Sequence, residues 1–154
     1  MCKVLFLTNV IRRMGMMQQT LEKLQQEGKL DASCACRWLK DNTQWDNKWQ
    51  QELESTDLVL MKWMGSGLDT PFLQKCLQYL KQKQIPFYVD AAGSKEGEVS
   101  QGIPIDRIAT IKQYALYGGE KNYYHLWLYL QQFLTKAEES IPRPDPIHWT
   151  GIYH

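Results

Sequence analysis

Short, almost wholly apolar runs alternate along the chain with longer stretches in which apolar residues recur every three or four positions. The clearest run is Asp57–Gly67, Asp-Leu-Val-Leu-Met-Lys-Trp-Met-Gly-Ser-Gly, where an apolar segment leads at once into a glycine-containing turn. A strand that is apolar at nearly every position is covered on both faces, which is typical of the interior of a parallel sheet. Gly65 and Gly67 allow a sharp turn where this strand ends. We therefore place this strand in the middle of a sheet.

Three further strands are predicted from the same kind of pattern. Lys3–Asn9 holds a continuous apolar run, and Ile85–Asp90 is entered through Pro86, a residue tolerated where a strand starts. Asp31–Leu39 alternates instead, which is typical of an edge strand with one less buried face. The polar and glycine-containing stretch Lys95–Gly102 is interpreted as an exposed loop.

Helices are predicted between these strands. Asn9–Gly15 is interpreted as a strand-to-helix loop, and the first helix then runs to Gly28, which stands where a C-cap is expected. Thr43 precedes Asp46 by three residues, which is an N-cap signature for the second helix. A third helix has Pro71 in its first turn. Each helix therefore connects two consecutive strands, as in a parallel α/β sheet.

Two helices follow the last predicted strand, one from Pro104 and one from Glu120, separated by glycines. Right-handed crossovers then give a doubly wound, mainly parallel four-stranded sheet of order 2-1-3-4, flavodoxin-like or Rossmann-like, with two extra C-terminal helices. We expect residues 1–138 to form this α/β domain. Residues 139–154 are interpreted as a proline-rich linker followed by the start of a next domain. On this interpretation the sequence is truncated within that next domain.

Composition narrows the class of protein further. The 154 residues suit one domain, and 18 Lys and Arg against 17 Asp and Glu give no reason to expect a nucleic acid or a membrane as partner. No run reaches the about 18 apolar residues of a membrane span, and the N-terminal run is too short for a secretory signal. The four cysteines lack Cys-x-x-Cys spacing and are interpreted as reduced thiols of a cytoplasmic protein.

The cysteines and tryptophans each have two interpretations. Cys34 and Cys36 alternate along the predicted edge strand and share one face, which favours small core residues over a metal or redox site. Trp45 and Trp49 lie one helical turn apart. They are interpreted as packing on the sheet, and stacking on a flat ligand is the alternative.

No catalytic set is evident in the sequence. It has no Gly-x-Ser-x-Gly element and no His-Glu-x-x-His element, and Asn9–Gly15 lacks both the dinucleotide glycine pattern and a phosphate-binding loop. Arg12 and Arg13 are interpreted as a solvated pair, with an anion site at a helix start as the alternative. We assign no metal ligand.

A ligand of a parallel sheet tends to bind at the carboxyl ends of the strands. Side chains that can donate hydrogen bonds, and glycines that allow close backbone approach, follow three of the predicted strands there. The predicted ligand-binding residues are Asn9, Met64, Gly65, Ser66, Gly93 and Ser94.

The second half of the chain resembles a known family. Gly118–Asn122, a Gly-Gly-x-x-Asn element, precedes a helix rich in aromatic residues and leucine, and Gly151–His154 reads Gly-Ile-Tyr-His. These elements resemble the N-terminal region of the cobaltochelatase large subunit, a family that includes the magnesium chelatase H subunit. The similarity extends to the first strand and to Asp57–Gly67. Ser66 interrupts a glycine pair there, and Gly93–Gly102 follows the family only loosely.

The resemblance implies a domain of an ATP-dependent ligase that inserts Co(II) into a corrin ring in cobalamin biosynthesis. Its implied partners are the remainder of the large subunit and AAA+ ATPase subunits, with a tetrapyrrole as substrate. Cobalt, ATP and the corrin belong to the full complex, so we expect no cofactor in this segment and no catalysis by it alone. Tetrapyrrole enclosure or subunit contact is the implied role.

Two other classes of function fit the residues. One is a stand-alone flavodoxin-like domain that binds a small ligand or a partner protein. The other is a small flavin-dependent oxidoreductase, against which the missing phosphate-binding loop counts.

Overall fold

The fold is built on a five-stranded sheet of order β2-β1-β3-β4-β5. The computed structural model describes residues 2–40, 43–64, 70–91, 97–136 and 141–146. Four strands are parallel, and the fifth runs antiparallel to β4. The strands are β1 (Lys3–Thr8), β2 (Ser33–Trp38), β3 (Leu58–Lys62), β4 (Phe87–Ala91) and β5 (Gly97–Gln101).

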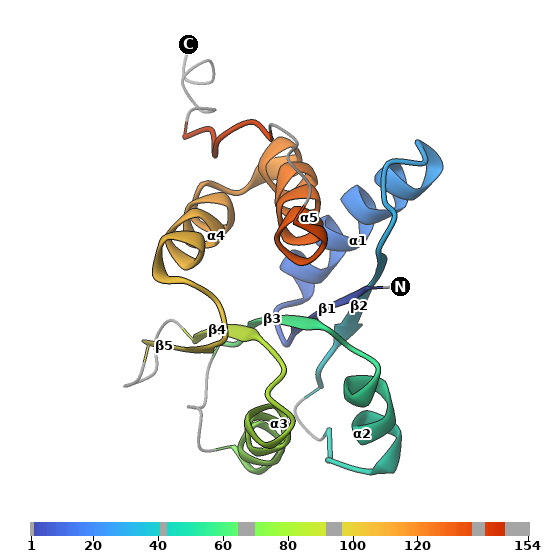
Figure 1. Cartoon of the computed structure of the whole chain (residues 1–154), viewed down its shortest axis with the longest axis vertical. Coiled ribbons are helices and arrows are strands. Elements are labelled where there is room, and N and C mark those ends of the chain that lie inside the picture. The colour runs from blue at the N-terminus through green and yellow to red at the C-terminus, as the bar shows by residue number, and fades with distance from the viewer. Residues whose placement is uncertain (1, 41–42, 65–69, 92–96, 137–140, 147–154) are drawn as a thin grey trace.

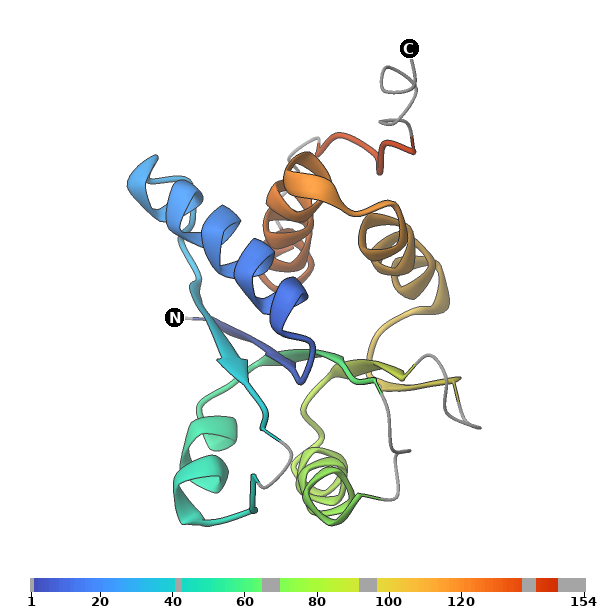
Figure 2. The same cartoon turned by 180° about the vertical axis from the view of Figure 1, so that it is seen from behind.

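Helices cover both faces of this sheet, so the molecule has three layers (Figure 1). One group of helices packs on one face and a second group on the other, as both views show (Figures 1 and 2). The first group is α1 (Ile11–Gln26), α4 (Ile105–Tyr117) and α5 (Gly119–Thr135), and the second is α2 (Asn47–Glu54) and α3 (Pro71–Gln82). The two C-terminal helices therefore complete one layer of the sandwich together with α1.

The interior strands supply both halves of the core. Along β1, Val4 and Phe6 join the cluster under α1, α4 and α5, while Leu5 and Leu7 join the cluster over α2 and α3. β3 divides its side chains in the same way. This two-sided burial explains the unbroken apolar runs, because successive side chains of a strand point to opposite faces. The predicted interior position of β3 is confirmed.

The predicted number of strands is wrong. Residues 97–101, placed in an exposed loop from the sequence, form β5 at the sheet edge, where Glu98 lies opposite Asp90 and Val99 opposite Val89. An edge strand has only one neighbour and one well-covered face, so polar residues are tolerated along it. The order predicted for the other four strands is confirmed.

Two helix starts also differ from the prediction. α1 begins at Ile11, so most of Asn9–Gly15 is helical rather than a loop. α2 is capped by Asp46, whose carboxylate accepts hydrogen bonds from the backbone of Lys48 and Trp49. An aspartate at this position satisfies amide groups that have no partner within the helix.

The predicted helix ends agree with the structure. Gly28 has a φ of +66°, and its amide and that of Lys29 bond to the carbonyls of Gln25 and Leu24. This is the Schellman arrangement, in which a glycine adopts the left-handed conformation at low cost. The predicted domain boundary at residue 138 and the segment 147–154 lie outside the described residues. Within the described ranges, no helix is both long enough and apolar enough to cross a membrane.

The central strands predict a large stability effect for Leu5→Ala. Leu5 is fully buried in β1, so the truncation leaves a cavity and is expected to lower the free energy of unfolding by about 2–5 kcal/mol. The matched control is Leu116→Ala on α4, where Leu116 is 78% exposed and a change within about 0.5 kcal/mol is expected. Urea unfolding followed by circular dichroism measures both. Equal effects would contradict the assignment of Leu5 to the core.

Candidate functional site

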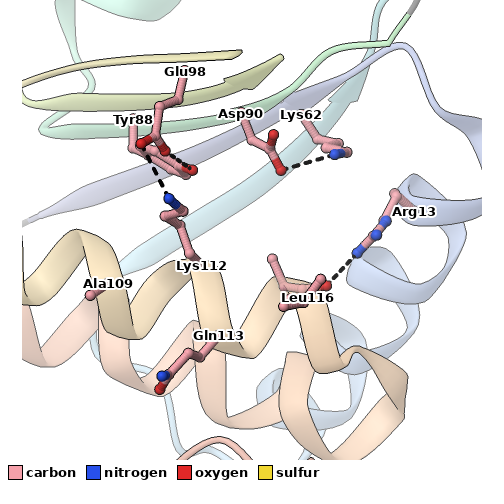
Figure 3. Close-up of a pocket in the computed structure, with 10 residues that line it drawn as sticks. Arg13, Lys62, Tyr88, Asp90, Glu98, Ala109, Lys112, Gln113 and Leu116 are labelled. Atoms are coloured by element: carbon pink, nitrogen blue, oxygen red, sulfur yellow. Dashed lines mark hydrogen bonds and ion pairs between the residues drawn. The ribbon is translucent and has the colours of Figure 1, made fainter. Parts of the chain in front are cut away.

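A row of polar residues crosses the carboxyl end of the sheet. Thr8 of β1 pairs in register with Lys62 of β3, Lys62 pairs with Asp90 of β4, and Asp90 pairs with Glu98 of β5. Residues in register on adjacent strands project to the same face. The row therefore lies on the face covered by α1, α4 and α5, and Figure 3 shows Lys62, Asp90 and Glu98 on that side.

Alternation along the strands explains the position of this row. On β3, Leu58 and Leu60 precede Lys62 on the same face, and both belong to the core cluster under α1, α4 and α5. On β4, Tyr88 precedes Asp90 in the same way. The strands are thus apolar where helices cover them and become polar only at their last inward position.

Each carboxylate of the row is paired with a lysine. Lys62 Nζ lies 2.9 Å from Asp90 Oδ2, and their side chains are 13% and 28% exposed. Lys112 of α4 lies 3.2 Å from Glu98 Oε1, and these side chains are 50% and 42% exposed. Like charges directly opposite on neighbouring strands repel, so the two lysines offset the repulsion between Asp90 and Glu98. The first pair is held within the sheet, whereas the second opens to solvent.

Tyr88 completes this network. Its hydroxyl donates a hydrogen bond of 2.8 Å to Glu98 Oε2. Burial raises the pKa of Tyr88 well above the usual range, and the bond to Glu98 and the charge of Asp90 act in the same direction. Tyr88 therefore stays a neutral donor throughout the physiological pH range.

Arg13 brings a third cation to the same place from the first turn of α1. Its guanidinium donates to the carbonyl of Ala115 over 2.8 Å and to the hydroxyl of Tyr123, and it lies 5.7 Å from the centre of the Tyr123 ring. Neither partner carries a negative charge, and no carboxylate among the described residues forms an ion pair with Arg13. Arg13 therefore contributes a net positive charge at the junction of three helices.

These residues line a cleft of about 700 Å³ between the sheet and α4 (Figure 3). A smaller apolar recess of about 30 Å³ lies beneath it, and Arg13, Lys62, Tyr88 and Asp90 line both. Three cations, two carboxylates and an apolar floor suit a ligand that carries anionic or amide groups around an apolar body. The cleft is lined by Arg13, Lys62, Tyr88, Asp90, Glu98, Ala109, Lys112, Gln113, Ala115 and Leu116.

Of the six predicted ligand-binding residues, the structure brings two together. The Asn9 amide donates to the carbonyl of Met64 over 2.6 Å and accepts from the Met64 amide over 2.8 Å. Asn9 therefore joins the ends of β1 and β3, where the strand order reverses. Gly65, Ser66, Gly93 and Ser94 lie outside the described residues, so their role and that of Asn9 in ligand binding stay predictions.

Sequence reasoning missed most of the cleft. Lys62 and Asp90 could have been identified from the sequence, because each is a polar residue at or next to the end of an apolar strand. Arg13 was interpreted as a solvated residue, yet it is half-buried and bonds to a carbonyl 102 positions away. Lys112 looks like any exposed helical lysine, and Glu98 was assigned to a loop. Only the pairing of β5 with β4 reveals that these two side chains meet.

Trp45 and Trp49 are half-buried against the core cluster over α2 and α3, and their ring contacts are with residues of α3 rather than with the sheet as predicted. The rings of Trp45 and Trp49 lie 6.0 Å and 5.2 Å from the ring of Phe72 in edge-on contacts, and Trp45 also contacts Tyr79. Such aromatic pairs add to the burial energy of the α2–α3 layer.

The cysteines are core residues as well. Cys34, Cys36 and Cys76 are buried, and Cys2 is partly exposed. Burial raises the pKa of each of the three buried thiols to about 12. A neutral thiol is a poor nucleophile and a poor metal ligand. Among the described residues, no group of three His, Cys, Asp or Glu side chains is placed to hold a metal ion.

Comparison with known proteins gives one informative similarity. No protein-family model and no curated protein sequence matches the chain. Among solved structures, it is similar to the catalytic subunit of cobaltochelatase from Mycobacterium tuberculosis, with a TM-score of 0.65 and 12% sequence identity. The similarity covers 95% of this chain and 11% of that chain, so the sequence spans about a ninth of that subunit. At this identity the similarity shows a shared fold.

The two ion pairs are predicted to differ in strength. Double-mutant cycles with Lys62→Met and Asp90→Ala are expected to give a coupling of about 1–3 kcal/mol, because this pair is largely shielded from water. Lys112→Met and Glu98→Gln form the matched cycle on the exposed pair, with an expected coupling below about 1 kcal/mol. Urea unfolding measures both. A coupling near zero for Lys62 and Asp90 would contradict a fixed ion pair in the lining of the cleft.

Thiol reactivity tests the burial of the cysteines. At pH 8 the three buried thiols stay protonated, because their pKa of about 12 lies far above this pH, so an aromatic disulfide reagent should modify only Cys2 at an appreciable rate. Mass spectrometry after a timed reaction measures this. All four thiols should react once the chain is unfolded in urea. Rapid modification of Cys34 or Cys36 in the folded protein would be the opposing result.

Proposed function

We propose that this chain is the α/β domain of a cobaltochelatase large subunit, within an ATP-dependent complex that inserts Co(II) into a corrin ring in cobalamin biosynthesis. The supporting observation is the similarity of fold, over nearly the whole chain, to part of a cobaltochelatase catalytic subunit. The sequence elements Gly118–Asn122 and Gly151–His154 point to the same family. The remainder of such a subunit and AAA+ ATPase subunits would be its partners, in the cytoplasm.

The cleft under α4 suggests what this domain contributes. A corrin substrate has an apolar ring system bordered by carboxylate and amide groups. Arg13, Lys62 and Lys112 can bind carboxylates at that border, while Asp90 and Glu98 can accept hydrogen bonds from amides. The apolar recess offers a surface for the ring edge. In this role the domain helps to enclose the tetrapyrrole and catalyses no step itself.

The alternative is a stand-alone flavodoxin-like domain that binds a different small ligand or a protein. The strand order and the cleft are compatible with it. A flavin cofactor fits poorly, because Thr8 ends β1 and Ile11 starts α1, which leaves only Asn9 and Val10 between them. Asn9 is already tied to Met64. A backbone loop that wraps a phosphate needs more residues than this.

Binding of the corrin can be measured by tryptophan fluorescence. Titration with hydrogenobyrinic acid diamide should give saturable quenching at micromolar concentration, and protoporphyrin serves as the comparison ring. Lys112→Met removes one cation from the rim of the cleft and is expected to weaken the affinity about tenfold. Lys48→Met, an exposed change on α2 at the opposite face, should leave the affinity unaltered.

Two results would count against this role. Binding that Lys112→Met does not weaken would place the ring outside the cleft. If neither ring quenched the tryptophan fluorescence, the proposed contact with a tetrapyrrole would be rejected. Subunit contact would then be the role of the domain. Co-purification with the AAA+ subunits would then be the decisive assay.

A further inference from the structure

The segment 141–146, Ile-Pro-Arg-Pro-Asp-Pro, lies against α4 and α5 rather than free in solvent. Ile141 packs against the core cluster under α1, α4 and α5. The hydroxyl of Tyr114, a buried residue of α4, donates to the carbonyl of Pro142. Lys121 of α5 lies 3.0 Å from the carboxylate of Asp145. A proline at every second position keeps such a segment extended. The segment is thus held along its length by side chains of two helices.

Asn122 makes the most specific of these contacts. Its side-chain nitrogen donates to the carbonyl of Gly118 over 2.7 Å and to that of Asp145 over 2.9 Å, and its oxygen accepts from the Asp145 amide over 2.8 Å. Asn122 is 4% exposed, and a buried amide is costly unless its polar groups are paired. Here the pairing depends on a residue 23 positions further along the chain.

Gly118 and Gly119, which precede Asn122, position its side chain for these hydrogen bonds. Gly118 and Gly119 have φ values of +62° and +82°, which reverse the chain between α4 and α5. A side chain at either position would be strained. The element Gly118–Asn122 therefore combines the turn with the amide that holds the later segment.

The spacing of the prolines explains why the side-chain amide of Asn122 alone can pair with the backbone of the segment. Pro142, Pro144 and Pro146 have no backbone N–H, so Asp145 offers a complete N–H and C=O pair between two prolines. An asparagine side chain matches this pair with one donor and one acceptor. Because the segment belongs to the same chain, its effective concentration at the site is high.

We propose that Tyr114, Lys121 and Asn122 form a docking site for an extended, proline-spaced segment, and that residues 141–146 occupy it as an intramolecular latch. The latch holds residues 141–146 against the α4–α5 layer. Asn122 is its positioning residue, and the Tyr114 contact holds the start of the segment. This inference is independent of the proposed chelatase role, because it uses no residue of the cleft.

Amide hydrogen exchange of the full chain, followed by NMR, tests the latch at Asp145. The Asp145 amide should exchange at least tenfold more slowly than the same amide in an unfolded chain, because it donates to Asn122. Asn122→Ala should abolish that protection, and Tyr114→Phe should reduce it while leaving the ring in place. Amides of β1 and β3 report in the same spectra that each variant remains folded.

Glu120→Gln is the matched control on α5, because it changes an exposed ion pair with Lys23 of α1 that does not involve the segment, and protection should stay within about twofold. Protection should also be independent of protein concentration. The proposal is overturned if the Asp145 amide is unprotected in the unaltered chain, or if Asn122→Ala leaves it protected. Protection that appears only at high concentration would assign the occupant to a second copy of the chain and would equally overturn the latch.

Discussion

Burial of the central strands on both faces is the constraint on which the rest of the structure depends. β1, β3 and β4 have helices above and below them, so their side chains are apolar at almost every position. Charged side chains occur in these strands only at positions that the helices no longer cover. The ion pair between Lys62 and Asp90 and the cleft above it are therefore direct consequences of how the sheet is covered.

The same constraint decides how much of the fold the sequence can predict. Unbroken apolar runs mark interior strands clearly, and right-handed crossovers then restrict their order, so β3 was correctly placed between β1 and β4. β5 was not predicted, because Gly97–Gln101 is short and half polar, and an edge strand of that composition resembles a loop in sequence. Its pairing with β4 is a tertiary contact that no local pattern encodes.

The position of the cleft near the carboxyl ends of the strands could be expected from the topology, but the residues that line it could not. Topology directed attention to the carboxyl ends of the strands, where Asn9 and Met64 indeed meet. Arg13 and Lys112 reach the cleft from helices, through contacts that depend on how α1 and α4 pack. A helical lysine or arginine has the same local sequence signal whether it faces solvent or a cleft. The role of Asn122 is hidden for the same reason, because its partner lies beyond the end of α5.

The proposed role of the domain depends on whether the cleft between α4 and the sheet binds the border of a corrin ring. The most direct measurement is a map of amide chemical-shift changes on the isotopically labelled full chain during titration with hydrogenobyrinic acid diamide. Binding in the cleft predicts saturable changes centred on Lys62, Asp90, Glu98 and Lys112, with the amides of α2 and α3 unaffected. Changes confined to the α2–α3 face, or no changes up to millimolar ligand, would contradict it.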